Sequence, residues 1–132
     1  MKLLFVLPEY PPYHGGGIIT FYRELLPLLA RMGHKVHVIV GSGVVAEHEP
    51  RPTMIDGVSV EMLDAKRFEQ QFRNFETFAS TPMLRRHLAA AWAIHEQVGQ
   101  GEYFDLVEAT DWGRLFVAWV VEAGPPAVVQ LH

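Results

Sequence analysis

The sequence predicts an α/β fold, with a doubly wound parallel sheet of the Rossmann-like type, from three observations. Short apolar runs without polar alternation, of which Leu3 to Leu7 is the first, are typical of strands covered on both faces. Amphipathic helical patterns alternate with these runs along the chain. Because crossovers between parallel strands are right-handed, the alternation favours the strand order 3-2-1-4-5, counted along the chain.

The first unit is a strand, a loop and a helix. After the first apolar run, the segment Pro8 to Gly17 contains too many prolines and glycines to continue a strand or a helix. Apolar residues then recur at helical spacing from Ile18 to Met32, and Gly33 stands at the usual stop position. Pro27 falls inside this helix, where its missing N–H should bend the axis.

The middle of the chain predicts two more strands and two helices. Val36 to Val40 forms a second strand, and Met54 to Met62, with the turn signal Asp56-Gly57, forms a third strand or a hairpin. A stripe of phenylalanines indicates a helix from Lys66 to Ala79, as part of the core or of a domain contact. Pro82 is suited to the first position of the next helix. The expected inner face of that helix comprises Leu84, Leu88, Ala91, His95 and Val98.

The last part of the chain predicts a strand, a helix and a strand. Phe104 to Val107 is a short apolar strand, and Ala127 to Leu131 is the final one. Asp111 is a suitable N-cap for a helix that runs through Glu122.

Three segments of unusual composition follow predicted strands, namely Pro8 to Gly17, Glu108 to Gly113, and His132. In open α/β sheets, ligands bind outside the carboxyl ends of the strands, where the strand order reverses. We therefore expect these three segments to meet there and to form the functional site.

Composition excludes several classes of function. A net charge of −4 without a large basic cluster argues against a nucleic-acid partner. The absence of cysteine excludes disulfides, a thiolate nucleophile and a Cys-based zinc site, and fits a cytoplasmic protein. No H-E-x-x-H motif or carboxylate cluster predicts a metal. The longest apolar run, Leu115 to Val121, is far shorter than the ~20 residues that cross a bilayer, so we expect a soluble chain.

Gly15, Gly16 and Gly17 lead into a helix, so their amides and the positive helix end are suited to a phosphate or a sugar oxygen. A plain turn is the alternative. The glycine spacing differs from G-x-G-x-x-G, and no Walker lysine follows, which argues against nicotinamide and P-loop enzymes. Glu9, in the same loop, is either an acceptor for a sugar hydroxyl or a solvated acid.

An aspartate beside an aromatic residue, here Asp111 and Trp112, is a common way to hold a sugar. Each also has a structural interpretation, Asp111 as an N-cap and Trp112 as a packing residue. His132 ends a buried strand, where its imidazole is placed to donate to a substrate oxygen, and a purely structural histidine is the alternative.

On these residues the chain resembles the amino-terminal domain of glycosyltransferase family 4, whose members include glycogen synthase-like enzymes with the two-domain GT-B architecture. The resemblance implies retaining transfer of a sugar from a nucleoside diphosphate sugar to a hydroxyl of a sugar or lipid-linked acceptor, with no metal or other cofactor. The matching stretches are LLFVLPEYPPYHGGG, LARMGHKVHVIV, YFDLVEATDWG and PAVVQLH.

The resemblance also implies roles for individual residues. It places the glycines near the donor diphosphate and sugar, Glu9 toward the acceptor, and His132 near the reacting carbon. Many members carry H-x-H-D-W where this chain has Glu108, Thr110, Asp111 and Trp112, which leaves the acceptor open. The expected catalytic residues are His132 and Asp111, and the expected substrate-binding residues are Glu9, Gly15, Gly16, Gly17 and Trp112.

The resemblance implies that residues 1–132 are an incomplete, acceptor-side amino-terminal domain, without the carboxy-terminal donor domain and inactive alone. An apolar strand at the end of such a fragment predicts self-association through its open edge, and a monomer whose short terminal strand frays is the alternative. Two alternatives remain, a sugar-nucleotide epimerase of the same architecture and a non-catalytic binding domain that uses the stripe Phe68 to Phe78 as its contact surface.

Overall fold

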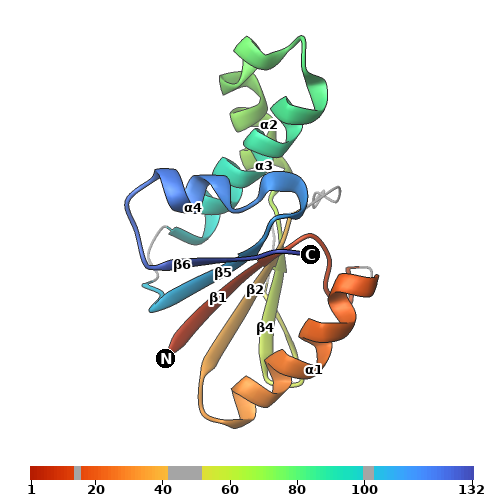
Figure 1. Cartoon of the computed structure of the whole chain (residues 1–132), viewed down its shortest axis with the longest axis vertical. Helices are drawn as coiled ribbons and strands as arrows, with labels where there is room; N and C mark the ends of the chain where they lie inside the picture. The colour runs from red at the N-terminus through yellow and green to blue at the C-terminus, as the bar shows by residue number, and fades with distance from the viewer. Residues whose placement is uncertain (14–15, 42–51, 100–102) are drawn as a thin grey trace.

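The computed structural model describes residues 1–13, 16–41, 52–99 and 103–132. These residues form one six-stranded sheet in the order β3-β4-β2-β1-β5-β6, with helices on both faces (Figure 1). All neighbouring strands are parallel except β3 and β4. The predicted doubly wound sheet and its order are confirmed for the parallel strands. The strands are β1 Lys2–Leu7, β2 Lys35–Val40, β3 Thr53–Ile55, β4 Val58–Met62, β5 Leu106–Thr110 and β6 Ala127–Gln130.

The central strand β1 shows why the sheet is covered on both faces. Leu3, Phe5 and Leu7 pack in a core cluster with helix α1, whereas Leu4 and Val6 pack in a second cluster with α3 and α4. An uninterrupted apolar strand therefore packs against a helical layer on each face of the sheet. The helices are α1 Gly17–Arg31, α2 Ala65–Asn74, α3 Pro82–Gly99 and α4 Val117–Val121, with short 3₁₀ turns η1 Glu76–Phe78 and η2 Trp112–Arg114.

Helix α1 follows its apolar stripe. Tyr22 and Leu26, two of its buried side chains, are completely covered, and Pro27 lies inside the helix as expected. Gly33 has a φ of 95°, a left-handed conformation that glycine adopts without a Cβ penalty, and this ends the helix at the predicted place.

The expected third strand is a hairpin. Strand β3 runs antiparallel to β4 at the outer edge of the sheet. The two residues between them, Asp56 and Gly57, have φ values of 50° and 81°. Two successive positive φ angles match the right-handed twist of the flanking strands, which explains why the Asp-Gly signal marks this turn.

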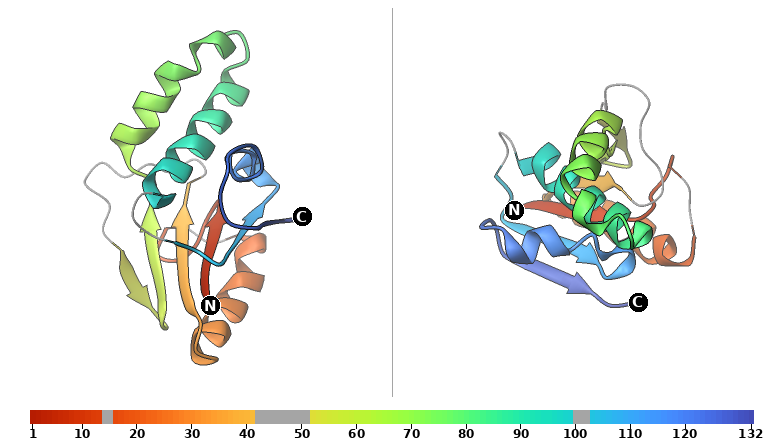
Figure 2. Two further views of the ribbon diagram at one scale, coloured as in Figure 1. Left: turned by 90° about the vertical axis from the view of Figure 1, so that its left-hand side faces the viewer. Right: turned by 90° about the horizontal axis from the view of Figure 1, so that it is seen from above.

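Helices α2 and α3 form an antiparallel pair that extends past the sheet (Figure 2). The phenylalanine stripe faces α3 inside this pair: the Phe75 ring lies 5.4 Å from the Trp92 ring, and the Arg85 guanidinium lies 3.7 Å from the Phe72 ring centroid. These phenylalanines are half-buried against α3, and no side chain of α2 is fully buried, so the choice between core and domain contact stays a prediction. No described helix is long and apolar enough to cross a membrane.

The expected inner face of α3 was partly wrong. Ala91 and Val98 are buried, but Leu84, Leu88 and His95 are only half-buried. The first half of α3 extends with α2 beyond the sheet (Figure 2), so α2 covers the leucines there and no strand does. His95 packs against Trp119 of α4. Ala90, Ala93 and Ile94 instead belong to the core cluster that includes Leu4 and Val6 of β1. The buried side chains are Ala89, Ala90, Ala91, Ala93, Ile94 and Val98.

Two predicted boundaries near the site were also wrong. Strand β5 runs from Leu106 to Thr110 and not from Phe104 to Val107. Its pairing with β1 starts at Leu106, which lies opposite Leu3. Phe104 is buried just before the strand. The expected helix from Asp111 to Glu122 is interrupted, since Gly113 and Arg114 have φ values of 67° and 55°, which an α-helix cannot contain.

Strand β6 lies at the other edge of the sheet and pairs only with β5 among the described strands. It ends at Gln130, one residue before the predicted end. Val128 and Leu131 are exposed large apolar residues on this strand and just after it. The expected self-association through this edge stays a prediction, which sedimentation at several concentrations tests.

Candidate functional site

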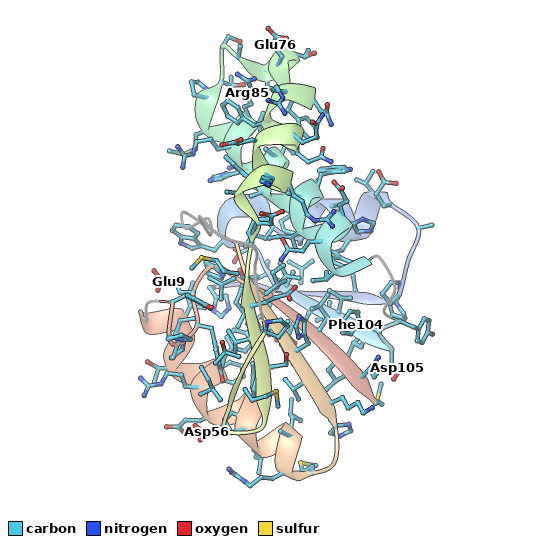
Figure 3. All side chains as sticks on the ribbon, turned by 180° about the vertical axis from the view of Figure 1, so that it is seen from behind. Glu9, Asp56, Glu76, Arg85, Phe104 and Asp105 are labelled. Carbon is cyan, nitrogen blue, oxygen red and sulfur yellow. The ribbon has the colours of Figure 1, made fainter. Side chains whose placement is uncertain are left out.

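The strand order reverses between β1 and β5, and the predicted site residues gather where these strands and β6 end. We call this region the carboxyl end of the sheet; its strands finish at Leu7, Thr110 and Gln130. Figure 3 shows Glu9 beside the start of α1, far from Asp105. Asp105 accepts a hydrogen bond from the Lys2 N–H at 2.7 Å and marks the opposite end of the sheet.

Glu9 and Gly16 lie in contact at the start of α1. Gly16 is the N-cap, in extended backbone, and no side chain caps the helix there. A Cβ at Gly16 would lie 3.0 Å from Oε2 of Glu9, so the glycine lets the carboxyl group approach the positive helix end. A Cβ on Gly17 would meet nothing within 4 Å. Gly15 falls outside the described residues.

Asp111 and His132 are joined directly. The backbone N–H of His132 donates to Oδ1 of Asp111 at 3.2 Å, and the Asp111 N–H donates to the Gln130 carbonyl at 3.2 Å. The Asp111 side chain therefore continues the β5–β6 ladder by one step and fixes the backbone of His132. This replaces the expected N-cap role, because the Asp111 side chain makes no capping bond to η2.

The imidazole of His132 lies against Tyr22 of α1, which is not among the predicted site residues. The rings of His132 and Tyr22 meet edge to face, with centroids 6.2 Å apart. The Tyr22 hydroxyl donates to Oε2 of Glu108 at 2.8 Å. Burial raises the pKa of Tyr22 well above its usual range, and the hydrogen bond to Glu108 raises it further. The phenol therefore remains protonated.

The signal for this pair was present in the sequence. Tyr22 falls on the apolar stripe of α1, and a tyrosine hydroxyl that is buried in a core requires a partner. Glu108 belongs to β5 rather than to a loop, so its side chain reaches the α1 layer of the core. Because the predicted strand ended at Val107, Glu108 was placed in a loop and was not expected to be the partner of a buried tyrosine.

Thr110 is the other residue that stands where H-x-H-D-W carries a histidine. Its side chain is completely buried at the end of β5. Within residues 1–13, 16–41, 52–99 and 103–132, its hydroxyl has no hydrogen-bond partner. A small hydroxyl thus occupies this place without contributing a bond to the described structure.

Trp112 is half exposed and lies next to α3, on the face of the sheet opposite α1. It borders a groove of about 610 Å³ between η2 and the α2–α3 pair. His87 in this groove has its pKa lowered by burial and then by Arg114 and Arg86. Its Nδ1 therefore accepts from Nη1 of Arg114 at 2.7 Å. The groove surface is mostly apolar and includes Phe68, Met83, Arg86, His87, Trp112 and Leu115.

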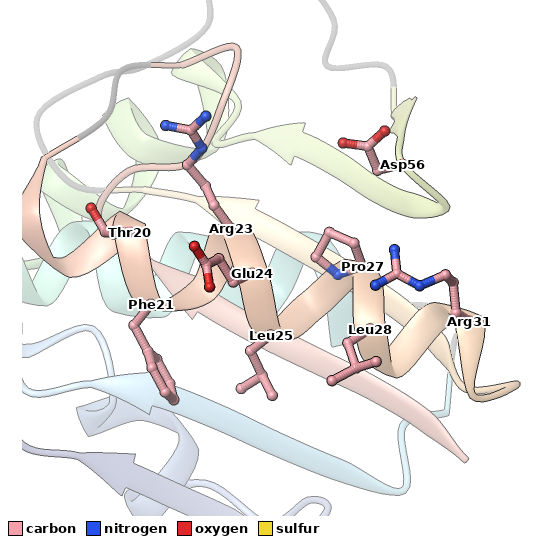
Figure 4. Close-up of a pocket in the computed structure, with 9 residues that line it drawn as sticks. All are labelled: Thr20, Phe21, Arg23, Glu24, Leu25, Pro27, Leu28, Arg31 and Asp56. Atoms are coloured by element: carbon pink, nitrogen blue, oxygen red, sulfur yellow. The ribbon is translucent and has the colours of Figure 1, made fainter.

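A larger surface hollow, of about 840 Å³, runs along α1 and contains none of the predicted site residues (Figure 4). Its charged side chains, Arg23, Glu24, Arg31 and Asp56, have mixed signs. Asp56 comes from the β3–β4 turn. The hollow thus lies along the side of the sheet rather than at its carboxyl end, and volume alone does not identify the site.

No group of three metal-ligating side chains occurs in the described parts of the chain.

Residues 16–132 match a family model described as a glycosyl transferase 4-like domain. The chain belongs to this family. The resemblance to glycosyltransferase family 4 is thereby confirmed. No curated protein sequence matches the chain.

Two solved structures share the fold. The catalytic domain of starch synthase IV from Arabidopsis thaliana, bound to ADP and acarbose, superposes with a TM-score of 0.60 at 17% identity. The α,α-trehalose 6-phosphate synthase from Burkholderia multivorans superposes with a TM-score of 0.55 at 14% identity. Each covers 99% of this chain, whereas the chain spans 34% and 33% of their lengths. The expected Rossmann-like fold of a GT-B glycosyltransferase is confirmed.

Proposed function

We propose that this chain is the acceptor-side part of a retaining glycosyltransferase that moves a sugar from a nucleoside diphosphate sugar to a hydroxyl. The acceptor is a sugar or a lipid-linked group, and no metal is required. Membership of the glycosyl transferase 4-like family supports transfer as the class of reaction. The observation that carries the assignment of the site is the Asp111 carboxylate, which fixes His132 at the carboxyl end of the sheet.

In this proposal His132 and Asp111 are the catalytic residues. The His132 side chain is exposed and is free to donate from its imidazole to an oxygen of the donor sugar near the reacting carbon. Asp111 uses Oδ1 for the His132 backbone, and Oδ2 is placed to accept from a sugar hydroxyl. Glu9 and Trp112 bind the acceptor from opposite sides of these residues.

The start of α1 contributes the electrostatic part. As the bond to the diphosphate breaks, negative charge develops on the leaving group and positive charge on the oxocarbenium-like ring. Backbone amides at Gly16 and Gly17 offer donors from residues that have no side chain of their own, and we assign Gly15 the same role from the resemblance. The neighbouring Glu9 carboxyl accepts hydrogen bonds, so hydroxyl-bearing ligands suit both groups together.

We propose that the nucleotide is bound mainly by residues outside these 132, and that the chain alone is inactive. The starch synthase IV structure holds ADP, which is the leaving group of an ADP-sugar, and this chain spans 34% of it. Incubating the isolated chain with the donor and acceptor of the intact gene product tests this. Turnover by the isolated chain would contradict it.

The reaction class is tested on the intact gene product with a panel of ADP-, UDP- and GDP-sugars and hydroxyl acceptors. We expect one donor to release its nucleoside diphosphate in an acceptor-dependent way. Proton NMR of the product should show the donor's anomeric configuration, in the presence of a chelator as well as without it. Interconversion of the donor without an acceptor would indicate an epimerase, and failure to bind any donor would indicate a non-catalytic domain; either overturns the proposal.

A further inference from the structure

We infer that Tyr22 is the residue that positions the imidazole of His132, and that Glu108 holds Tyr22 in the orientation this requires. The inference rests on the function proposed above and adds a positioning pair to it. Neither residue is among those that the family resemblance implies for the site.

His132 is held at two points, its backbone and its ring. The Asp111 carboxylate fixes the backbone N–H of His132, and the Tyr22 ring supports the imidazole edge to face at 6.2 Å, with 64° between the planes. The His132 side chain is otherwise exposed, and two torsion angles separate its ring from the backbone. The aromatic contact is therefore what restricts the direction of the ring nitrogens.

Tyr22 itself is rigidly held. It is completely buried, its ring meets Phe5 at 6.0 Å and Phe21 at 5.1 Å, and its hydroxyl donates to Glu108 at 2.8 Å. Glu108 is the residue of β5 that lies opposite Phe5 of β1 in the sheet. The hydrogen bond thus ties α1, which begins at the glycines, to β5, the strand that Asp111 directly follows.

A tyrosine and a glutamate can also pair in a core merely to satisfy each other's polar atoms. The contact with His132 goes beyond that need, because an exposed imidazole does not require a buried aromatic neighbour. Glu108 also replaces the first histidine of H-x-H-D-W, so the pair is a feature of this chain rather than of that pattern.

The test uses four variants of the intact gene product, and a fifth for the assignment of resonances. Tyr22→Leu removes the ring, Tyr22→Phe keeps the ring but loses the bond to Glu108, and Glu108→Gln keeps an acceptor for the tyrosine hydroxyl. Leu26→Ala is the matched control, since Leu26 is completely buried one turn later in α1 and belongs to the same core cluster. Imidazole resonances of His132, assigned by their loss in His132→Gln, report the ring position without any substrate.

We expect Tyr22→Leu to shift the His132 resonances and to lower kcat by roughly tenfold, with little change in the KM of the donor, because the reacting geometry is lost rather than ground-state binding. Tyr22→Phe should lower kcat less, and Glu108→Gln should retain most of it. Leu26→Ala should lower the melting temperature without moving the His132 resonances.

Unchanged His132 resonances in Tyr22→Leu would overturn the inference. So would a normal kcat in Tyr22→Leu at a melting temperature lowered as in Leu26→Ala, which would mean a purely structural role. If Tyr22→Leu does not fold, a wild-type kcat and unchanged His132 resonances in Tyr22→Phe would overturn it instead. An intact protein without transferase activity would refute the proposed function, while the resonances would still decide whether Tyr22 positions His132.

Discussion

The side chain of Asp111 accepts a hydrogen bond from the backbone N–H of His132 at 3.2 Å. This bond joins the first residue after β5 to the end of the segment that follows β6, so it connects two loops of the predicted site. The sequence predicted neither this bond nor which of the two residues donates, because Asp111 and His132 are far apart in the chain. It makes the location of His132 depend on a carboxylate 21 residues away.

Replacing Asp111 should therefore loosen His132 more than it destabilises the fold. The bond is exposed to solvent, so Asp111→Ala should cost at most about 1 kcal/mol of unfolding free energy. Asp111→Asn retains an acceptor oxygen and should keep the His132 amide protected. Hydrogen exchange of that amide distinguishes the variants, and equal protection in Asp111→Ala would show that the bond does not form in solution.

Gly16→Val should lower turnover in the intact gene product more than it lowers stability. Gly16 has a φ of −132°, which any residue adopts, and its Cβ would meet only the flexible end of Glu9 at 3.0 Å. The fold can therefore accept valine, but Glu9 and the exposed amides lose their arrangement. Gly124→Ala serves as the control, because Gly124 lies before β6 and a Cβ there meets nothing within 4 Å. A large fall in melting temperature with unchanged kinetics would favour the plain-turn interpretation.

The buried Tyr22 phenol should make stability fall at high pH. Its pKa is raised in the folded state above the ordinary value of 10.0, so the unfolded chain loses this proton first. The contribution is complete below pH 10 and is lost as pH rises above it, by at most about 1.4 kcal/mol per pH unit. Denaturant unfolding between pH 9 and 11 should show a shallower decline for Tyr22→Phe. Parallel curves for the two proteins would contradict the assigned environment.

Thr110→Val should leave the isolated chain as stable as the wild type or slightly more so. The buried threonine hydroxyl has no partner in the described structure, and burying an unsatisfied hydroxyl costs about 1–3 kcal/mol, which valine of the same shape avoids. Chemical denaturation measures the difference. A loss of more than 1 kcal/mol in the variant would reveal a partner for the hydroxyl.

Much of the fold could be predicted because its signals are local. Continuous apolar strands such as β1, the glycine stop at Gly33 and the Asp56-Gly57 turn each depend on neighbours in the sequence. The strand order then followed from the handedness of crossovers, and the sheet confirms it. The β5 boundary failed because Glu108 and Thr110 are polar residues in a strand whose register is set by β1.

From the sequence, the predicted site residues could be placed at one end of the sheet, but the contacts between them could not be predicted. The topological rule brought Glu9, Gly16, Asp111 and His132 to one end of the sheet, as the structure shows for the described residues. The individual contacts depend on tertiary geometry. Tyr22 is 86 residues from Glu108, and only the packing of α1 across β1 onto β5 brings them together.

The central claim is that His132, held at the carboxyl end of the sheet, takes part in sugar transfer. The most direct test is kcat of the intact gene product carrying His132→Ala, with His34→Ala as the control. His34 lies at the opposite end of the sheet, 3.2 Å from the amino group of Met1. We predict a loss in kcat of roughly 10²-fold or more for His132→Ala at an unchanged melting temperature, and wild-type rates for His34→Ala. A His132→Ala enzyme that turns over at the wild-type rate would contradict the account.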